Sequence, residues 1–310
     1  MDPERRVGLV GLGNMGGALA ASLLRAGAST WGFDIDRARL DAFEAAGGHV
    51  AGSPAGVAAE CDTLITSLPS VRALEEVVDG DGGLLTSTRD DLIVIEASTL
   101  PLDVKEAARE RLRSRSAVLL DCPVSGTAAQ ARVGDLVVFA SGDRAAVDRV
   151  VWVFETVGRS WHYVGAFGVG SKMKYIANLL IAVHNLAAGE ALVLGAKAGL
   201  DPRMVHEVIS DSAATSRMFE VSGQIIVDGA YDDGEAKVEI LHKDLQIIRS
   251  FAAEAGAPSP LLAITTEFYT AAMALGMHSK EDASVAVLLE RLAGLDGLAT
   301  GSPDPRGDER

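Results

Sequence analysis

The sequence predicts an α/β fold, with an N-terminal doubly wound domain around a parallel sheet and a C-terminal all-helical domain joined to it by a long helix. Two observations lead to this prediction. Short apolar runs alternate with helical stretches up to about residue 164, and strand patterns disappear after Gly170, where long Ala- and Leu-rich stretches begin. Alternating strands and helices build a parallel sheet, whereas successive amphipathic helices pack on one another.

The strands and helices of the first domain follow the order of βαβ units. Apolar runs of strand length stand at Val7–Val10, Thr30–Phe33, Thr63–Ser67, Leu92–Ile95, Ala117–Leu120 and Val137–Ser141. The first helices are expected at Ala18–Ala26 and Arg37–Ala46. In the second domain, the long Ala- and Leu-rich stretches predict helices at Ser171–Ala198, Pro202–Ser210, His242–Glu254 and Ser259–Gly276.

The length and the change of pattern place the domain boundaries. Single hydrophobic cores stop growing at about 250 to 300 residues, so a chain of 310 residues is expected to build two. We predict a first domain over residues 1–165 and an all-helical domain over residues 166–297. Residues 298–310 are rich in Pro, Gly and charge, have little to bury, and are expected to be disordered.

The charge of the chain argues against several kinds of partner. A net charge of −15 repels phosphate backbones and anionic headgroups, so neither nucleic acid nor a membrane is an expected partner. An anionic substrate would have to be drawn in by a local positive pocket. The most apolar stretch, Ile176–Leu194, is interrupted by Asn178, His184, Asn185 and Glu190, and is expected to be a buried helix rather than a membrane span.

Two features point to the cytoplasm. Cys61 and Cys122 are the two cysteines of the chain, too few for a disulfide framework, and their apolar or small neighbours suit reduced thiols. Residues 1–6 lead straight into the first expected strand, without the apolar stretch of a signal peptide.

A glycine-rich turn, Gly11-Leu12-Gly13-Asn14-Met15-Gly16, follows the first expected strand and opens the first helix. In this position the pattern is typical of a Rossmann domain, whose glycines permit a tight turn, backbone approach to a pyrophosphate and close helix packing. Asp34 ends the next strand, where its carboxylate would accept hydrogen bonds from ribose hydroxyls and repel a 2′-phosphate. We therefore predict NAD as cofactor, with some use of NADP left open by the nearby Arg37. The alternative is a glycine turn without a ligand, and an Asp34 that faces solvent.

Two further segments suggest a substrate site. The turn Ser125-Gly126-Thr127 follows an apolar strand, and its small residues are expected to leave backbone N–H groups and two hydroxyls free to receive a carboxylate. The long helix after Gly168 carries Lys174 and Asn178 four positions apart, and therefore on one face.

Lys174 is the candidate for proton transfer. Hydride transfer from an alcohol leaves a proton to be removed, and a desolvated lysine can be tuned toward neutral pH for this step. Lys172 lies about 200° round the helix from Lys174 and is expected to face solvent. The alternative for Lys174 is an ammonium at the surface above a stem that lies on apolar neighbours.

Four motifs, in this order, resemble those of the β-hydroxyacid dehydrogenases, a family that includes 3-hydroxyisobutyrate dehydrogenase. They are Gly11–Gly16, Asp121–Gly134, Gly168–Asn178 and Lys243-Asp244-Leu245, and the resemblance covers about residues 6 to 295. It implies that Lys174 is the catalytic lysine and that Asn178 and the Ser125-Gly126-Thr127 turn hold a small anionic hydroxy acid. It further implies that Leu68, Pro69 and Thr99 line the NAD site and that Lys243 reaches the cofactor.

The chain departs from the family pattern at two positions. Thr127 stands where glycine is usual, so its added methyl and hydroxyl could narrow the pocket, and Cys122 replaces a common alanine as an inert small core residue. The segment Ser212–Phe219 looks like the loop of L-threonate-type members, which suggests a polyhydroxylated acid. Arg217 in this loop could bind a distal carboxylate or phosphate, although a solvated side chain is the favoured interpretation. The six histidines show no metal-ligand spacing, and no metal site is expected.

The predicted reaction is hydride transfer between NAD and the CH–OH group of a small hydroxy acid that resembles 3-hydroxyisobutyrate. An L-threonate dehydrogenase or a semialdehyde reductase is the alternative. Imine reductases look similar but generally lack a lysine at the position of Lys174. A non-catalytic dinucleotide-binding protein would have no need of Ser125, Lys174, Asn178 and Lys243 together. A homodimer or homotetramer is expected, because the helix Ser171–Ala198 is apolar on more than one face.

Overall fold

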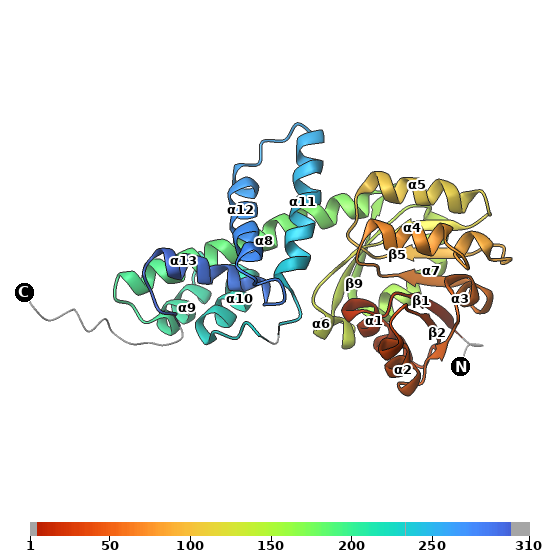
Figure 1. Ribbon diagram of the computed structural model, residues 1–310, viewed down its shortest axis with the longest axis horizontal. Coiled ribbons are helices and arrows are strands. Elements are labelled where there is room, and N and C mark those ends of the chain that lie inside the picture. Colours follow the sequence, from red (N-terminus) through yellow and green to blue (C-terminus); the bar gives the residue numbers. More distant parts are fainter. Residues whose placement is uncertain (1–4, 233, 299–310) are drawn as a thin grey trace, which may run out of the picture. The chain divides into compact units, whose positions relative to one another are not determined.

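The chain divides into two compact units, Met1–Lys174 and Tyr175–Arg310, of which the computed structural model describes residues 5–232 and 234–298. The first unit contains the sheet and the second is helical (Figure 1). This architecture confirms the predicted fold class. The domain boundaries at residues 165 and 297 stay predictions, and residues 299–310 of the predicted tail lie outside the described residues.

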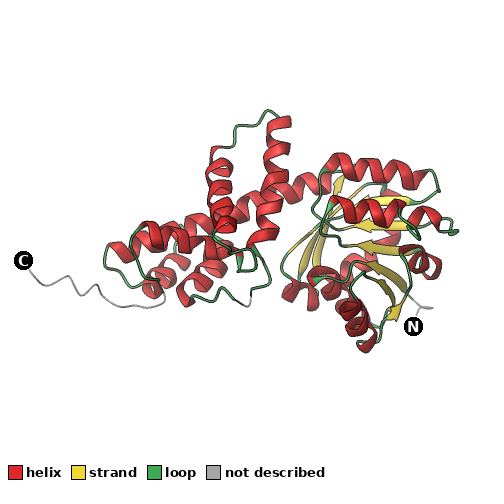
Figure 2. Ribbon diagram, viewed as in Figure 1, coloured by secondary structure: helices red, strands yellow, loops and turns green. Residues whose placement is uncertain are grey.

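A sheet with helices on both faces forms the first unit (Figure 2). In the described residues it has nine strands, in the order β3-β2-β1-β4-β5-β6-β8-β7, and β9 also pairs with β8. The strands are β1 Arg6–Val10, β2 Ser29–Phe33, β3 His49–Val50, β4 Thr63–Thr66, β5 Ile93–Glu96, β6 Val118–Asp121, β7 Val124–Ser125, β8 Leu136–Ser141 and β9 Gly158–Gly165.

The strand order reverses beside β1. This strand pairs in parallel with β2 on one side and with β4 on the other. Open α/β sheets bind ligands at such a switch point, beyond the carboxyl ends of the strands. The sheet is not parallel throughout, because β8 runs antiparallel to β6 and β7. Ser125, which the sequence predicts in a turn, ends β7, because a two-residue strand shows no periodic pattern.

Alternate strand residues divide between two cores. Ile93 and Ile95 of β5 pack on the same side as Leu19, whereas Val94 packs on the opposite side with Leu74. The period of two therefore gives each face of the sheet its own helical layer. The helices of this unit are α1 Asn14–Arg25, α2 Arg37–Ala45, α3 Pro54–Glu60, α4 Val71–Asp79, η1 Leu84–Thr86, α5 Leu102–Arg113, α6 Ala128–Arg132 and α7 Arg144–Val157.

The helical unit contains two helices that were not predicted from the sequence, α10 Arg217–Asp228 and α13 Ala286–Leu292. The segment expected as a loop ends in the first turn of α10, which Ser216 caps and Gly229 terminates in the left-handed conformation. In addition, α11 begins at Val238, four residues before the expected start at His242. The helices are α8 Val169–Lys197, α9 Pro202–Ser210, α10 Arg217–Asp228, α11 Val238–Glu254, α12 Pro260–Ala274, η2 Asp282–Val285 and α13 Ala286–Leu292.

The long helix α8 begins in the first unit and continues into the second. Among the described residues it is long and apolar enough to cross a membrane by length and composition, and its most apolar window is 44% buried. Its polar residue Asn185 is fully buried, donates to Asp282 Oδ1 at 2.8 Å and accepts from Ser222 Oγ at 2.8 Å. Such internal pairing of buried polar groups is typical of a core helix in a bundle.

Candidate active site

The glycine-rich turn has the geometry of a phosphate cradle. Gly11 has a φ of +90°, and a Cβ on Gly11 or Gly16 would clash with backbone oxygens, so only glycine fits there. A Cβ on Gly13 would meet only the Arg39 guanidinium, at 3.5 Å. Gly13 is the N-cap of α1 and places no side chain on the first-turn N–H groups. The helix start, from Asn14 onward, is therefore open to an anion.

Asp34 is held against this turn. Its side chain is 4% exposed, accepts from the Leu12 N–H at 2.6 Å, and lies 3.4 Å from Arg39 Nη1. Arg37, the residue considered for NADP in the sequence analysis, instead pairs with Asp41 at 2.8 Å on the exposed side of α2. Two positions along a helix turn a side chain by about 200°. Arg39, which sequence reasoning missed, is therefore the cation beside Asp34.

The next predicted cofactor residues follow β4 and β5. The Leu68 N–H donates to Ser98 Oγ at 2.8 Å, which joins the loop that contains Leu68 and Pro69 to the loop that contains Thr99. The Leu68 side chain also lies 3.2 Å from the Cβ position of Gly11. All these loops leave the carboxyl ends of neighbouring parallel strands, so the predicted cofactor residues of the first unit lie along one edge of the sheet.

The Ser125-Gly126-Thr127 turn differs from its prediction at Thr127. Thr127 is the N-cap of α6: its N–H donates to Gln130 Oε1 at 3.0 Å, and its hydroxyl accepts from the Gln130 N–H at 3.3 Å. The prediction that the amide and the hydroxyl of Thr127 are free for a substrate was therefore wrong, because a capping box uses both groups. Gly126 has a φ of +137°, and Ser125 ends β7 with a half-buried side chain.

Lys174 and Asn178 both lie on α8, one turn apart. Lys174 is half-buried, and Asn178 is 5% exposed. The Asn178 amide donates to Asp244 Oδ2 at 2.6 Å, and Asp244 Oδ1 forms an ion pair at 2.8 Å with Lys243 Nζ. Lys172 is exposed, as expected.

Asp244 thus links two of the predicted site residues, Asn178 and Lys243, within the helical unit. Sequence reasoning missed this role. The available signal was the position of Asp244, directly after Lys243 and inside one of the four motifs.

Arg217 is 79% exposed and pairs with Glu220 at 3.1 Å.

Cys122 is fully buried in the core on the same face of the sheet as Leu19, and burial raises the pKa of its thiol well above the ordinary value. Burial likewise raises the pKa of Cys61, to about 12. Neither thiol has the low pKa of a reactive cysteine.

A doubly wound sheet with a glycine-rich phosphate turn, followed by an all-helical domain, defines the class of NAD(P)-dependent dehydrogenases. Comparison with known proteins agrees. Residues 6–165 match the family model of the NAD binding domain of 6-phosphogluconate dehydrogenase. Residues 168–289 match the model described as NAD-binding of NADP-dependent 3-hydroxyisobutyrate dehydrogenase.

Individual relatives cover nearly the whole chain. L-threonate dehydrogenase from Cupriavidus necator is 35% identical over 283 residues, which are 91% of this chain and 95% of that protein. The structure of 3-hydroxyisobutyrate dehydrogenase from Salmonella typhimurium is 32% identical, with a TM-score of 0.83 over 92% of this chain and 100% of that one. The Mycobacterium tuberculosis 3-hydroxyisobutyrate dehydrogenase with L-serine is 26% identical, with a TM-score of 0.83 over 92% of this chain and 99% of that one.

The chain belongs to the β-hydroxyacid dehydrogenase family. It is an NAD(P)-dependent oxidoreductase that acts on CH–OH groups of hydroxy acids.

Proposed function

We propose that this enzyme is a cytoplasmic, NAD-preferring dehydrogenase of a small anionic hydroxy acid that resembles 3-hydroxyisobutyrate or L-threonate, with Lys174 as its general acid and base. Relatives of both names match the chain over 90% or more of its length. The two cysteines are buried and free, which suits a reducing compartment.

The position of Lys174 is the observation that carries this proposal. The N-terminus of α8 is bonded to Asp121, the last residue of β6, and to Ser141, the last residue of β8, which pairs with it. The glycine turn, Asp34 and the loops after β4 and β5 leave the same edge of the sheet. An ionisable amine on a helix that begins at this edge can serve alcohol oxidation, because a proton must leave the hydroxyl as the hydride departs. An imine reductase has no such proton to remove from an alcohol.

The residues of the sheet edge fit NAD. The N-terminus of α1 has no side-chain cap and would receive the pyrophosphate there. Asp34 stands at the end of β2, where the adenosine ribose hydroxyls would lie, and Leu68, Pro69 and Thr99 border the rest of the edge. NAD, when bound, supplies the hydride acceptor. The Lys174 Nζ then takes the proton from the substrate oxygen and returns it in the reverse reaction, while Ser125, Gly126 and Asn178 orient the carboxylate.

Initial rates of NADH formation on a panel of hydroxy acids test the proposed substrate class. The panel is 3-hydroxyisobutyrate, L-threonate, glycerate, serine and 3-hydroxypropionate. We expect one of the first two to give the highest kcat/KM. The absence of turnover on all five hydroxy acids would contradict the proposal.

The preference for NAD is proposed to rest on Asp34. The change Asp34→Ser removes both the ribose hydrogen bonds and the repulsion of a 2′-phosphate. It also removes one of the two carboxylates that pair with Arg39, so that Arg39 can attract that phosphate. We expect the kcat/KM ratio of NAD over NADP to fall by about tenfold or more, since each 1.4 kcal/mol changes a ratio about tenfold. Glu44→Ser, which removes an exposed carboxylate of α2, is the control and should leave the ratio unchanged. A wild-type enzyme that prefers NADP would show that the role given to Asp34 is wrong.

A homodimer or homotetramer is proposed from the apolar surface of the helical unit. Ile176, Leu180 and Leu194 of α8 are 53%, 47% and 70% exposed, and Met204 and Val208 of α9 are 46% and 60% exposed. Large apolar side chains in such numbers on one unit are expected to be covered by a second copy of the chain. Light scattering at micromolar concentration should give at least twice the mass of one chain. A fully active, monodisperse single chain would contradict this proposal.

A further inference from the structure

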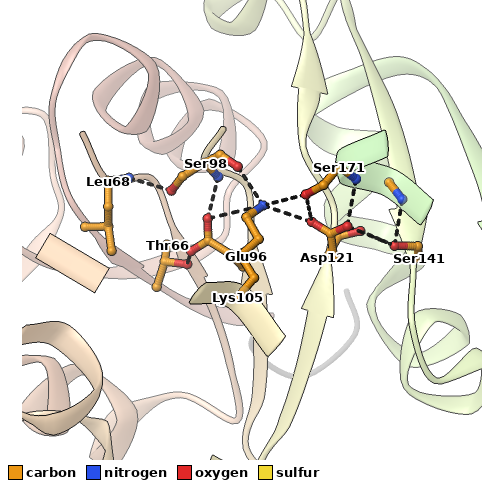
Figure 3. A network of polar contacts seen from close by, with 9 residues as sticks. Thr66, Leu68, Glu96, Ser98, Lys105, Asp121, Ser141 and Ser171 are labelled. Carbon is orange, nitrogen blue, oxygen red and sulfur yellow. Dashed lines mark hydrogen bonds and ion pairs between the residues drawn. The ribbon is translucent and has the colours of Figure 1, made fainter. Parts of the chain in front are cut away.

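A lysine that the reaction does not use directly lies buried in the first unit. Lys105 of α5 is fully buried, and so are the carboxylates of Glu96 and Asp121 beside it (Figure 3). The Lys105 Nζ lies 2.9 Å from Asp121 Oδ1 and 3.8 Å from Glu96 Oε1. Burial works to lower the pKa of Lys105, but Asp121 and Glu96 more than offset it, so that the pKa is raised and the ammonium stays charged.

Each of the three N–H groups of this ammonium has a hydrogen-bond acceptor. Lys105 Nζ donates to Ser98 O at 2.7 Å, to Asp121 Oδ1 at 2.9 Å and to Ser171 Oγ at 3.1 Å. An ammonium has three donors and no acceptor, so its hydrogen bonding is complete. A buried cluster of charged groups costs desolvation energy that apolar residues would avoid. What the cluster provides is a fixed local geometry.

Lys105, Glu96 and Asp121 form a hydrogen-bond network with their polar neighbours. One end of this network holds the first turn of α8. The Ser171 N–H donates to Asp121 Oδ2 at 2.7 Å, and the Ser171 hydroxyl donates to Asp121 Oδ1 at 2.7 Å. The Gly170 N–H donates to Ser141 Oγ at 3.0 Å. A Cβ on Gly170 would lie 2.5 Å from Asp121 O, so glycine is required for this close approach. Asp121 thereby acts as a remote cap of α8, with its negative charge at the positive end of the helix.

The other end of the network holds the loops proposed to line NAD. Lys105 binds the carbonyl of Ser98, the residue before Thr99, and the Ser98 hydroxyl accepts from the Leu68 N–H at 2.8 Å. Glu96 accepts from the Ser98 N–H at 2.7 Å and from the Thr66 hydroxyl. The same ammonium therefore bonds to the cofactor loops and to the turn of α8 that immediately precedes Lys174 (Figure 3).

We propose that Lys105 is a positioning residue for catalysis, which acts through Asp121 and Ser171 to fix Lys174 relative to the loops of Leu68 and Thr99. The proposal rests on the function proposed above for Lys174. A proton-transfer group must be held to about 0.5 Å, and a misplacement of about 1 Å can cost about 10² in rate. Ser171 stands three residues before Lys174, so a shift of this turn is passed on to Lys174 by the rigid helix.

Steady-state kinetics of Ser171→Ala test the proposal. This change removes the hydroxyl between Lys105 and Asp121 but leaves every charge in place, so the protein is expected to fold. We expect kcat to fall by about 10-fold to 100-fold, with KM for NAD changed by less than about threefold, because the loss concerns the transition state rather than cofactor binding. Ser171→Thr keeps the hydroxyl and should recover most of kcat.

Ser22→Ala is the matched control. Ser22 is 2% exposed in the same unit, and its hydroxyl donates to Thr156 O at 3.2 Å, outside the network. This variant should keep kcat within about twofold of wild type. Wild-type turnover in Ser171→Ala, or equal losses in Ser171→Ala and Ser171→Thr, would overturn the positioning role. Full activity of Lys174→Ala would instead overturn the proposed function itself, so the two failures are distinguishable.

Discussion

Replacing Lys174 by alanine is expected to lower kcat by about 10² to 10⁴, the range for loss of a general acid and base, and to leave NAD affinity nearly unchanged. The amine is proposed to take a proton from the substrate, whereas the cofactor is proposed to be held by the glycine turn, Asp34 and the loops after β4 and β5. Steady-state rates and calorimetric titration with NAD measure the two quantities on the same preparation.

Lys172→Ala is the matched control, because Lys172 lies two positions earlier on α8 and is exposed. It should retain wild-type turnover. A folded Lys174→Ala enzyme that turns over like wild type would remove the proposed role of Lys174.

Replacing Lys105 by methionine is expected to lower the free energy of unfolding by about 3 to 5 kcal/mol, because the change leaves two buried carboxylates without their cation. Glu96 and Asp121 are both fully buried, so water cannot replace the lost ammonium. Urea denaturation followed by circular dichroism measures the loss. Lys172→Met, at an exposed position, should change the unfolding free energy by less than about 0.5 kcal/mol. An unchanged denaturation midpoint for Lys105→Met would show that the network contributes nothing to stability.

Local patterns predicted most of the fold. The glycine turn, the first two strands and α8 were predictable because each depends on a short motif or on a long helical period. The strands β3, β7 and β9 were not, since β3 and β7 have two residues each and β9, with the sequence GRSWHYVG, contains no apolar run. Likewise α10 was obscured, because its first residues continue a Ser- and Ala-rich segment that resembles a loop.

The candidate site was predictable as a set of residues but not as a set of contacts. Arg39 and Arg37 look equivalent in the sequence, and only the start of α2 decides which of them reaches Asp34. Lys105 stands among charged residues of α5 and looks solvent-exposed. Its burial depends on carboxylates at the ends of two neighbouring strands, Glu96 and Asp121, which are brought to it by the sheet register. Such contacts over a long sequence separation leave no periodic signal.

Isotope transfer tests the central claim most directly. The enzyme is incubated with NAD and with a hydroxy acid that carries deuterium on its carbinol carbon, and the reduced nicotinamide is examined by mass spectrometry. Hydride transfer from the CH–OH group predicts that the deuterium appears in the reduced cofactor in wild type, and that this transfer slows by about 10² to 10⁴ in Lys174→Ala. Reduced cofactor without deuterium, or deuterium released to water, would contradict the proposed reaction.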